Sequence, residues 1–170
     1  ISGLRCSTRP DSLPPDRLAA LREAGCGCVE LGVQSFADAP LRESRRGYDG
    51  RTAREACVAV QAAGMRAGVQ LMPGMPGSRP EHFLADVRLA LELGAACLRF
   101  YPCLVLEGTE LAGLWRAGRF RPWPLETVLD VLAEAFALTQ RAGVPVIRMG
   151  LAPEAGLAGG VLAGPQFLFA

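Results

Sequence analysis

Two glutamines interrupt stretches of the chain that are otherwise apolar. Gln34 closes the apolar run of residues 28–34, and Gln70 lies inside the run of residues 67–72. A buried primary amide without a hydrogen-bond partner costs about 1–3 kcal/mol. Both side chains are therefore expected either to contact a polar ligand or to form hydrogen bonds within the protein. Composition alone does not decide between these two interpretations.

Two further segments could contact an anionic or polar ligand. Arg46 ends the basic run of residues 42–46, and its guanidinium could bind a carboxylate in a bidentate manner. By pattern alone, such a run is more often a solvated surface. Residues 73–78, which include Gly74, allow a close backbone approach before a helix. They lack the lysine and the spacing of a Walker loop, so a tight strand-to-helix turn is the more frequent structure.

Several kinds of catalytic site are excluded by the residues that the chain lacks. His82, the single histidine, lies in the first turn of a predicted helix and is expected to be exposed and not catalytic, and one histidine cannot build a multi-His zinc site. Lysine is absent, which argues against Schiff-base chemistry. Six cysteines lie mostly among apolar residues, as buried thiols of a reducing compartment do. The spacing of Cys26 and Cys28 is too tight for an iron–sulfur or zinc site. We expect a cytoplasmic protein whose own residues bind no metal.

Charge and hydropathy narrow the class of protein further. The 170 residues carry a net charge of +1 and are 50% hydrophobic, so no whole-chain field favours nucleic acid. No apolar stretch approaches the ~20 residues of a membrane span, and we expect no membrane partner. The chain starts at Ile1 instead of Met, and we expect it to begin inside a longer reading frame.

Short apolar runs alternate with longer helical patterns along the chain. Strands are predicted at residues 4–8, 28–34, 67–72, 97–101 and 144–149, and helices at 14–24, 52–63, 80–93, 109–117 and 125–142. Asp49 or Thr52 is expected to cap the second helix, and Ser78 with Glu81 has the capping-box pattern for the third. This rhythm predicts an α/β fold with a parallel sheet, either as part of a barrel or as an open doubly wound sheet.

Parallel α/β sheets bind ligands beyond the carboxyl ends of their strands. The predicted strands bring Ser7, Gln34, Gln70 and Tyr101 to those ends. Glu30 lies inside the second strand, where it could pair with an arginine at the closed end of a barrel or face the cavity. The sequence does not decide which.

Several segments, taken in order, resemble one family. They are residues 7–11, 30–36, 46–47, 70–77, 98–102, 104–111 and 114–120. The ordered set resembles the radical S-adenosylmethionine (SAM) core of the Elongator catalytic subunit and its bacterial relatives. Oxygen-independent coproporphyrinogen III oxidase resembles it more distantly. The resemblance implies parallel βα repeats that form part of a (β/α)₆ partial TIM-type barrel. Residues 1–150 would form its C-terminal two-thirds, and residues 151–170 would begin a C-terminal extension.

The resemblance also implies a cofactor and a reaction. Gln34, Arg46 and Gln70 match SAM-contacting positions, with Arg46 facing the SAM carboxylate. Ser7 and Tyr101 lie at strand ends beside the ligand, and the turn at Gly74 would shape the adenosine side. Family members cleave SAM reductively with a 4Fe–4S cluster, and the resulting 5′-deoxyadenosyl radical abstracts hydrogen from the substrate. The implied partners are the N-terminal half of the barrel, a reductant such as flavodoxin or ferredoxin, and a substrate that is tRNA or a small molecule.

The sequence departs from the family pattern at three points. The Cys-x₃-Cys-x₂-Cys cluster motif and the glycine-rich motif for the SAM amine do not occur in it, and Tyr48 replaces the usual histidine after Arg46-Gly47. We therefore expect the isolated chain to bind no cluster and to be inactive. Two alternatives stay open: a different barrel lyase, disfavoured by the lack of lysine, and a non-catalytic scaffold in which Gln34 and Gln70 bond internally.

Overall fold

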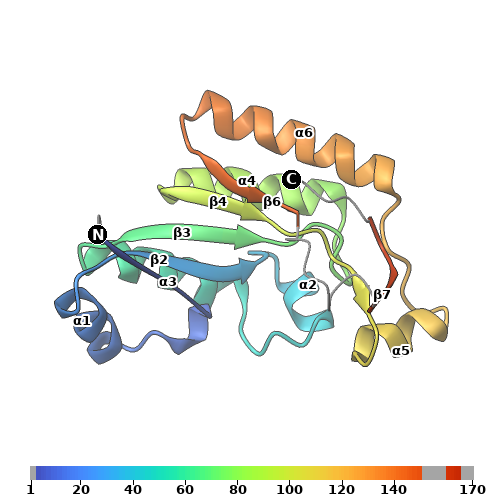
Figure 1. Ribbon diagram of the computed structural model, residues 1–170, viewed down its shortest axis with the longest axis horizontal. Coiled ribbons are helices and arrows are strands. Elements are labelled where there is room, and N and C mark those ends of the chain that lie inside the picture. Colours follow the sequence, from blue (N-terminus) through green and yellow to red (C-terminus); the bar gives the residue numbers. More distant parts are fainter. Residues whose placement is uncertain (1–2, 151–159, 166–170) are drawn as a thin grey trace.

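The computed structural model describes residues 3–150 and 160–165, and its centre is a parallel sheet of five strands (Figure 1). The sheet order is β1-β2-β3-β4-β6, and every neighbouring pair is parallel. Strand order thus follows chain order, with no reversal of the kind that defines a doubly wound sheet. Of the two folds that the sequence left open, this strand order is that of part of a barrel. The strands are β1 (Leu4–Thr8), β2 (Cys26–Gln34), β3 (Arg66–Leu71), β4 (Cys97–Phe100) and β6 (Val146–Met149).

Helices cover one face of the sheet, and the hydrophobic core lies between the two layers. Val29, Leu31 and Val33 of β2 are fully buried in it, as every second residue of a strand with one helix-covered face should be. Phe83 of α4 and Phe100 of β4 meet edge to face, with ring centroids 5.3 Å apart. The helices are η1 (Pro10–Ser12), α1 (Pro15–Glu23), α2 (Asp38–Glu43), α3 (Gly50–Ala62), α4 (Pro80–Glu92), α5 (Glu110–Arg116) and α6 (Leu125–Arg141).

The predicted strands and helices are all present, with ends that differ by two residues at most. The Asp49 cap is confirmed, because its carboxylate accepts a hydrogen bond from the Thr52 N–H at 2.8 Å. The capping box of Ser78 is wrong: Arg79 is the N-cap residue of α4 and makes no capping side-chain bond. The physical reason is Pro80, which favours the first helical position and keeps the residue before it extended.

Four elements have no counterpart in the sequence prediction, among them the single-turn helix η1. Another is the short helix α2. The others are β5 (Val105–Leu106) and β7 (Val161–Ala163), which pair as a small antiparallel sheet beside α5. Most of the expected C-terminal extension, residues 151–159 and 166–170, lies outside the described residues, so that expectation stays a prediction.

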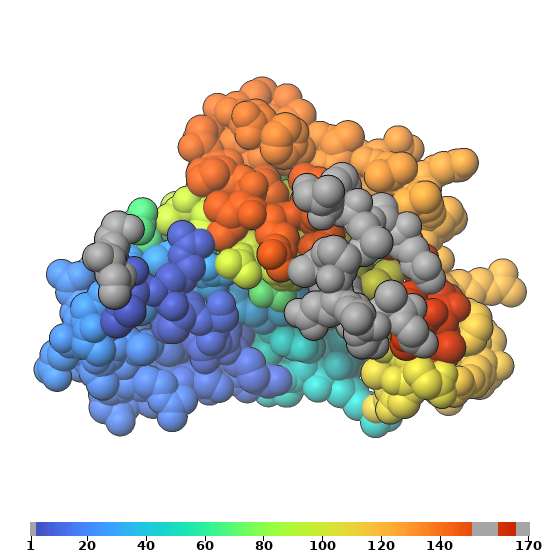
Figure 2. All heavy atoms as spheres, viewed as in Figure 1, coloured from blue at the N-terminus to red at the C-terminus, as the bar shows by residue number. Residues whose placement is uncertain are grey.

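In the space-filling view, the N-terminal segment lies at the left of the molecule and α6 lies along its top (Figure 2). Among residues 3–150 and 160–165, no helix combines the length and the apolar character that crossing a membrane requires.

Candidate functional site

The face of the sheet turned away from α1, α3 and α4, here called the inner face, carries a row of charged side chains. Glu30 of β2 is only 3% exposed and accepts from the guanidinium of Arg5 at 2.9 Å. Arg99 of β4 lies on its other side, with Nε 2.6 Å from Oε2 and a second nitrogen 3.1 Å from Oε1. The remaining nitrogen of Arg99 donates to the Tyr101 hydroxyl at 3.2 Å. The open question about Glu30 is thereby answered: it pairs with two arginines.

Gly68 of β3 makes room for the ion pair between Glu30 of β2 and Arg99 of β4. It lies between Glu30 and Cys97 in the register of the three strands. A Cβ at Gly68 would lie 2.9 Å from the sulfur of Cys97 and 3.0 Å from Cγ of Glu30. Both contacts are closer than carbon and sulfur tolerate, so only a glycine lets the carboxylate lean over β3 towards Arg99.

Gln34 ends β2 in a strained turn. Its φ is +64°, and the Ser35 N–H donates to the Val33 carbonyl at 2.8 Å across it, which makes a γ-turn of the rare positive-φ type. Such a conformation costs about 1–3 kcal/mol and persists only where surrounding contacts determine it. A Cβ at Gly32 would lie 3.0 Å from Nε2 of Gln34, so the missing side chain there gives the amide its space.

Among the described residues, the amide oxygen of Gln34 and the hydroxyl of Ser44, which lines the cleft, are both buried without a hydrogen-bond partner. Gln34 is 5% exposed, and its Oε1 is fully buried with no hydrogen-bond partner among the described residues. Buried polar atoms in folded proteins are nearly always paired, so this one requires a partner that the described residues do not supply. The scaffold alternative predicted an internally bonded Gln34, and this observation speaks against it.

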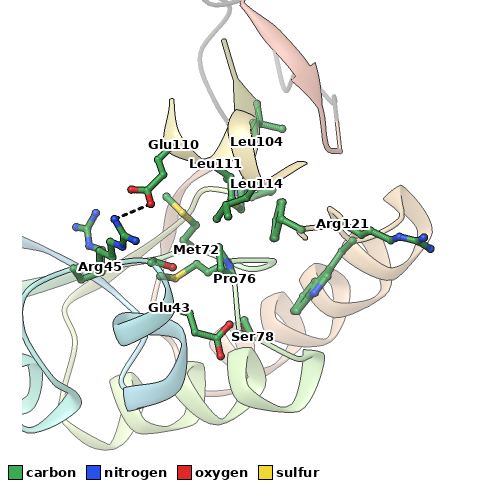
Figure 3. Close-up of a pocket in the computed structure, with 18 of the residues that line it drawn as sticks. Glu43, Arg45, Met72, Pro76, Ser78, Leu104, Glu110, Leu111, Leu114 and Arg121 are labelled. Carbon is green, nitrogen blue, oxygen red and sulfur yellow. Dashed lines mark ion pairs between the residues drawn. The ribbon is translucent and has the colours of Figure 1, made fainter. Parts of the chain in front are cut away.

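A cleft of about 760 Å³ opens at the carboxyl ends of β3 and β4 (Figure 3). Arg46 and Tyr101 line it, and Met75 brings the turn at Gly74 to its wall. Gly74 itself is buried with φ +83°, and a Cβ there would lie 3.5 Å from the Trp123 ring. The cleft is bounded by residues 43–46, 72–78 and 101–106, by α5 and by residues 119–123.

The cleft combines apolar walls with a charged rim. Met72, Leu111 and Leu114 form part of the apolar lining, whereas Arg45 and Glu110 meet at 2.7 Å as an ion pair across the rim (Figure 3). Four arginines and two glutamates line the cleft altogether. It therefore suits a ligand that carries both an apolar or aromatic group and a negative charge.

The other predicted site residues differ in how close they lie to this cleft. Gln34 is adjacent, because its carbonyl accepts from the Met72 N–H at 2.9 Å and Met72 lines the cleft. Gln70 is half-buried and pairs in register with Arg99. Ser7 is exposed on β1, in register with Glu30, and does not line the cleft.

The sequence did not predict the structural roles of two residues near the site, Tyr48 and Asp86. The Tyr48 hydroxyl lies 2.8 Å from the Gly32 carbonyl and 3.0 Å from the Val33 carbonyl, and the guanidiniums of Arg9 and Arg46 approach its ring at 5.4 and 5.8 Å. Asp86 lies buried in the apolar face of α4 and binds the segment after Gln34. The sequence does show an acid at helical spacing from the apolar Phe83 and Ala90, but it does not show which residues bind that acid.

Burial decides the protonation of several groups. It raises the pKa of Asp86 to about 6, against hydrogen bonds from Ser35 and Phe36 that lower it. It also raises the pKa of the Cys103 thiol, which lines the cleft, to about 11. That thiol is therefore neutral at physiological pH and a poor nucleophile or metal ligand.

Two family models together match most of the chain. The model of the radical SAM superfamily matches residues 1–90, and that of the radical SAM C-terminal domain matches residues 95–168. The chain belongs to the radical SAM superfamily.

Curated relatives within the superfamily include tRNA-modifying proteins. The chain is 35% identical over 139 residues to a tRNA uridine(34) acetyltransferase of Dehalococcoides mccartyi, covering 80% of this chain and 30% of that protein. It is 30% identical to Elongator complex protein 3 of Saccharomyces cerevisiae, covering 80% of this chain and 25% of that protein. The chain therefore spans less than a third of the length of these relatives.

Solved structures confirm the partial TIM-type barrel. Elp3 of the archaeon Methanocaldococcus infernus superposes with a TM-score of 0.81 at 28% identity, over 96% of this chain and 38% of that one. Coproporphyrinogen III oxidase (HemN) of Escherichia coli, a radical SAM enzyme, superposes with a TM-score of 0.65 at 22% identity, over 83% and 32% of the two chains. Both resemblances expected from the sequence are confirmed.

The two cofactors of the superfamily fit the described residues differently. SAM fits, because the cleft combines an arginine with apolar walls, and because Gln34, whose amide oxygen is buried without a partner among the described residues, binds the cleft residue Met72 through its backbone carbonyl. The 4Fe–4S cluster does not fit: among residues 3–150 and 160–165, no three His, Cys, Asp or Glu side chains are grouped to hold a metal ion.

Proposed function

We propose that this chain forms the SAM-contacting part of a cytoplasmic radical SAM enzyme. The observation that carries the proposal is the buried Oε1 of Gln34, which has no partner among the described residues; the backbone carbonyl of the same residue binds Met72, which lines the cleft. An N–H or O–H group of a bound ligand would satisfy it. When bound, SAM supplies the adenosyl group from which enzymes of this superfamily derive the radical that abstracts hydrogen.

Each candidate side chain would have a distinct role. Gln34 would accept a hydrogen bond from a polar hydrogen of SAM. Arg46, which lines the cleft and lies beside Tyr48, would bind the SAM carboxylate. The Tyr101 hydroxyl accepts a hydrogen bond from Arg99, and the Tyr101 side chain would contact the ligand at the end of β4. Gln70 and the backbone at Gly74 would complete the polar and adenosine sides, whereas the exposed Ser7 would contribute least.

Other components belong to a longer protein or to other molecules. The cluster ligands and the N-terminal strands of the barrel would come from outside this chain, and a flavodoxin or ferredoxin would serve as reductant. The chain by itself is expected to bind SAM without cleaving it.

A tRNA is the substrate class that we propose for the longer protein. The relative with 35% identity is by name a tRNA uridine(34) acetyltransferase. Arg119, Arg121 and Trp123 line the outer part of the cleft, where cationic and aromatic side chains suit phosphates and bases. We expect the longer protein to bind unmodified tRNA in a salt-dependent manner. Arg121→Gln should weaken this binding, whereas Arg54→Gln, on the helix-covered side, should not.

The direct test is SAM binding by this chain, measured by isothermal titration calorimetry. Gln34→Ala should weaken binding by about 5- to 100-fold, which corresponds to the loss of one hydrogen bond to a buried group. Gln140→Ala removes an exposed amide on α6 and is the matched control. If the wild-type chain does not bind SAM, or if both variants bind it as the wild type does, the proposal is wrong.

A further inference from the structure

The turn at Gln34 is held from α4, an element far along the chain. Asp86 accepts a hydrogen bond from the Ser35 hydroxyl at 2.6 Å and one from the Phe36 N–H at 2.8 Å. Ser35 and Phe36 are the two residues that directly follow Gln34. The Ser35 oxygen in turn accepts from the Ala37 N–H at 3.1 Å, so one carboxylate orders three consecutive residues.

Packing alone does not explain an acid at this position. Asp86 is 5% exposed and lies among Phe83, Val87 and Ala90, which form the buried face of α4. Burial disfavours the ionised carboxylate, and the contacts that oppose this all come from the segment after β2. An apolar side chain would fill the same space without that cost, but it could not receive the two hydrogen bonds.

The geometry links Asp86 to the amide oxygen of Gln34. The γ-turn requires that Ser35 donate its N–H back to Val33, which reverses the chain direction at Gln34. With Ser35 and Phe36 bound to α4, the turn cannot relax towards negative φ unless both hydrogen bonds break. On the other side, the Met72 N–H binds the Gln34 carbonyl at 2.9 Å. The turn is thus held by helix α4 on one side and by the end of the neighbouring strand β3 on the other.

We infer that Asp86 is a positioning residue, which holds the strained turn after β2 and thereby keeps the Gln34 amide directed at its ligand. The identity of that ligand rests on the proposed function, whereas the positioning itself is a property of this chain alone. Asp86 acts through Gln34 and does not contact the ligand.

The side-chain amides provide a readout that is independent of SAM. The chain has five glutamines and no asparagine, so a ¹⁵N–¹H spectrum contains five side-chain amide pairs, and Gln34→Ala identifies one. Asp86→Asn should shift or broaden that pair. Glu92→Gln, an exposed acid on the same helix, should not. Ser35→Ala removes one of the two hydrogen bonds and gives the answer if Asp86→Asn does not fold.

A double-mutant cycle on SAM affinity tests whether Asp86 acts through Gln34. Asp86→Asn should weaken binding in the wild type, yet by less than about 2-fold in the Gln34→Ala background. If the two substitutions instead reduce SAM affinity independently, so that their effects multiply in the double variant, the inference is wrong. It is also wrong if the Gln34 amide pair keeps its wild-type position in both Asp86→Asn and Ser35→Ala. If the wild-type chain does not bind SAM, the proposed function fails, but the spectra still decide the positioning.

Discussion

The buried carboxyl of Asp86 predicts an unusual dependence of stability on pH. Burial raises its pKa in the folded chain to about 6, from an ordinary value of 3.8. Between these two values, the folded state binds a proton that the unfolded state has released. The stabilisation from this proton is complete below about pH 3.8, and it is lost as the pH rises through about 6.

The expected magnitude follows from the separation of the two pKa values. About two pH units, at 1.36 kcal/mol each, give an upper limit of about 3 kcal/mol. Asparagine does not titrate, so the Asp86→Asn variant lacks this contribution. From pH 4 to pH 7, the free energy of unfolding of the wild type should therefore fall relative to that of the variant by up to about 3 kcal/mol.

Urea unfolding at several pH values between 4 and 7.5 measures this difference. Glu92→Gln serves as the control, because an exposed acid on the same helix should leave the pH profile nearly parallel to that of the wild type. Parallel profiles for Asp86→Asn would refute the reasoning. A wild type that gains stability over the variant with rising pH would show that the hydrogen bonds from Ser35 and Phe36 outweigh burial.

Three further substitutions test the contacts around the site. Gly68→Ala should lower the free energy of unfolding by about 1–3 kcal/mol through its clash with Cys97 and Glu30, whereas Gly27→Ala, whose Cβ would meet nothing closer than 4.0 Å, should not. Glu30→Gln leaves two arginines without their carboxylate and should cost about 1–3 kcal/mol in urea unfolding. Asp49→Ala removes the cap of α3 and should cost about 1 kcal/mol, seen as a lower Tm. Equal stability of each variant and the wild type would contradict these contacts.

The parallel sheet was predictable because each of its strands and covering helices has its own signal in consecutive residues. Buried strands are continuous apolar runs, and a capping residue such as Asp49 acts within one turn of its helix. Helix α2 was missed because six residues that include Pro40 carry no such period. Strands β5 and β7 are two and three residues long, and each is defined only by its distant partner.

The site was predictable only in part, since its geometry depends on contacts between distant residues. Gln34 could be singled out because an amide at the end of an apolar strand is unusual. Its positive φ could not be predicted, because it follows from hydrogen bonds to Asp86, 50 and 51 residues away from their donors. Ser7 was placed correctly on a strand but lies away from the cleft, because the registers of β1, β2 and β3 are not encoded in the local sequence.

The line of contacts from Arg5 through Glu30 and Arg99 to Tyr101 begins on β1 and ends at the mouth of the cleft. Parallel sheets are usually covered on both faces by packed helices, which leave no space for a ligand. These ion pairs and hydrogen bonds join β1, β2 and β4 across the inner face, which no helix of residues 3–150 and 160–165 covers. The strands are thus held together by polar contacts that also position Tyr101 in the lining of the cleft.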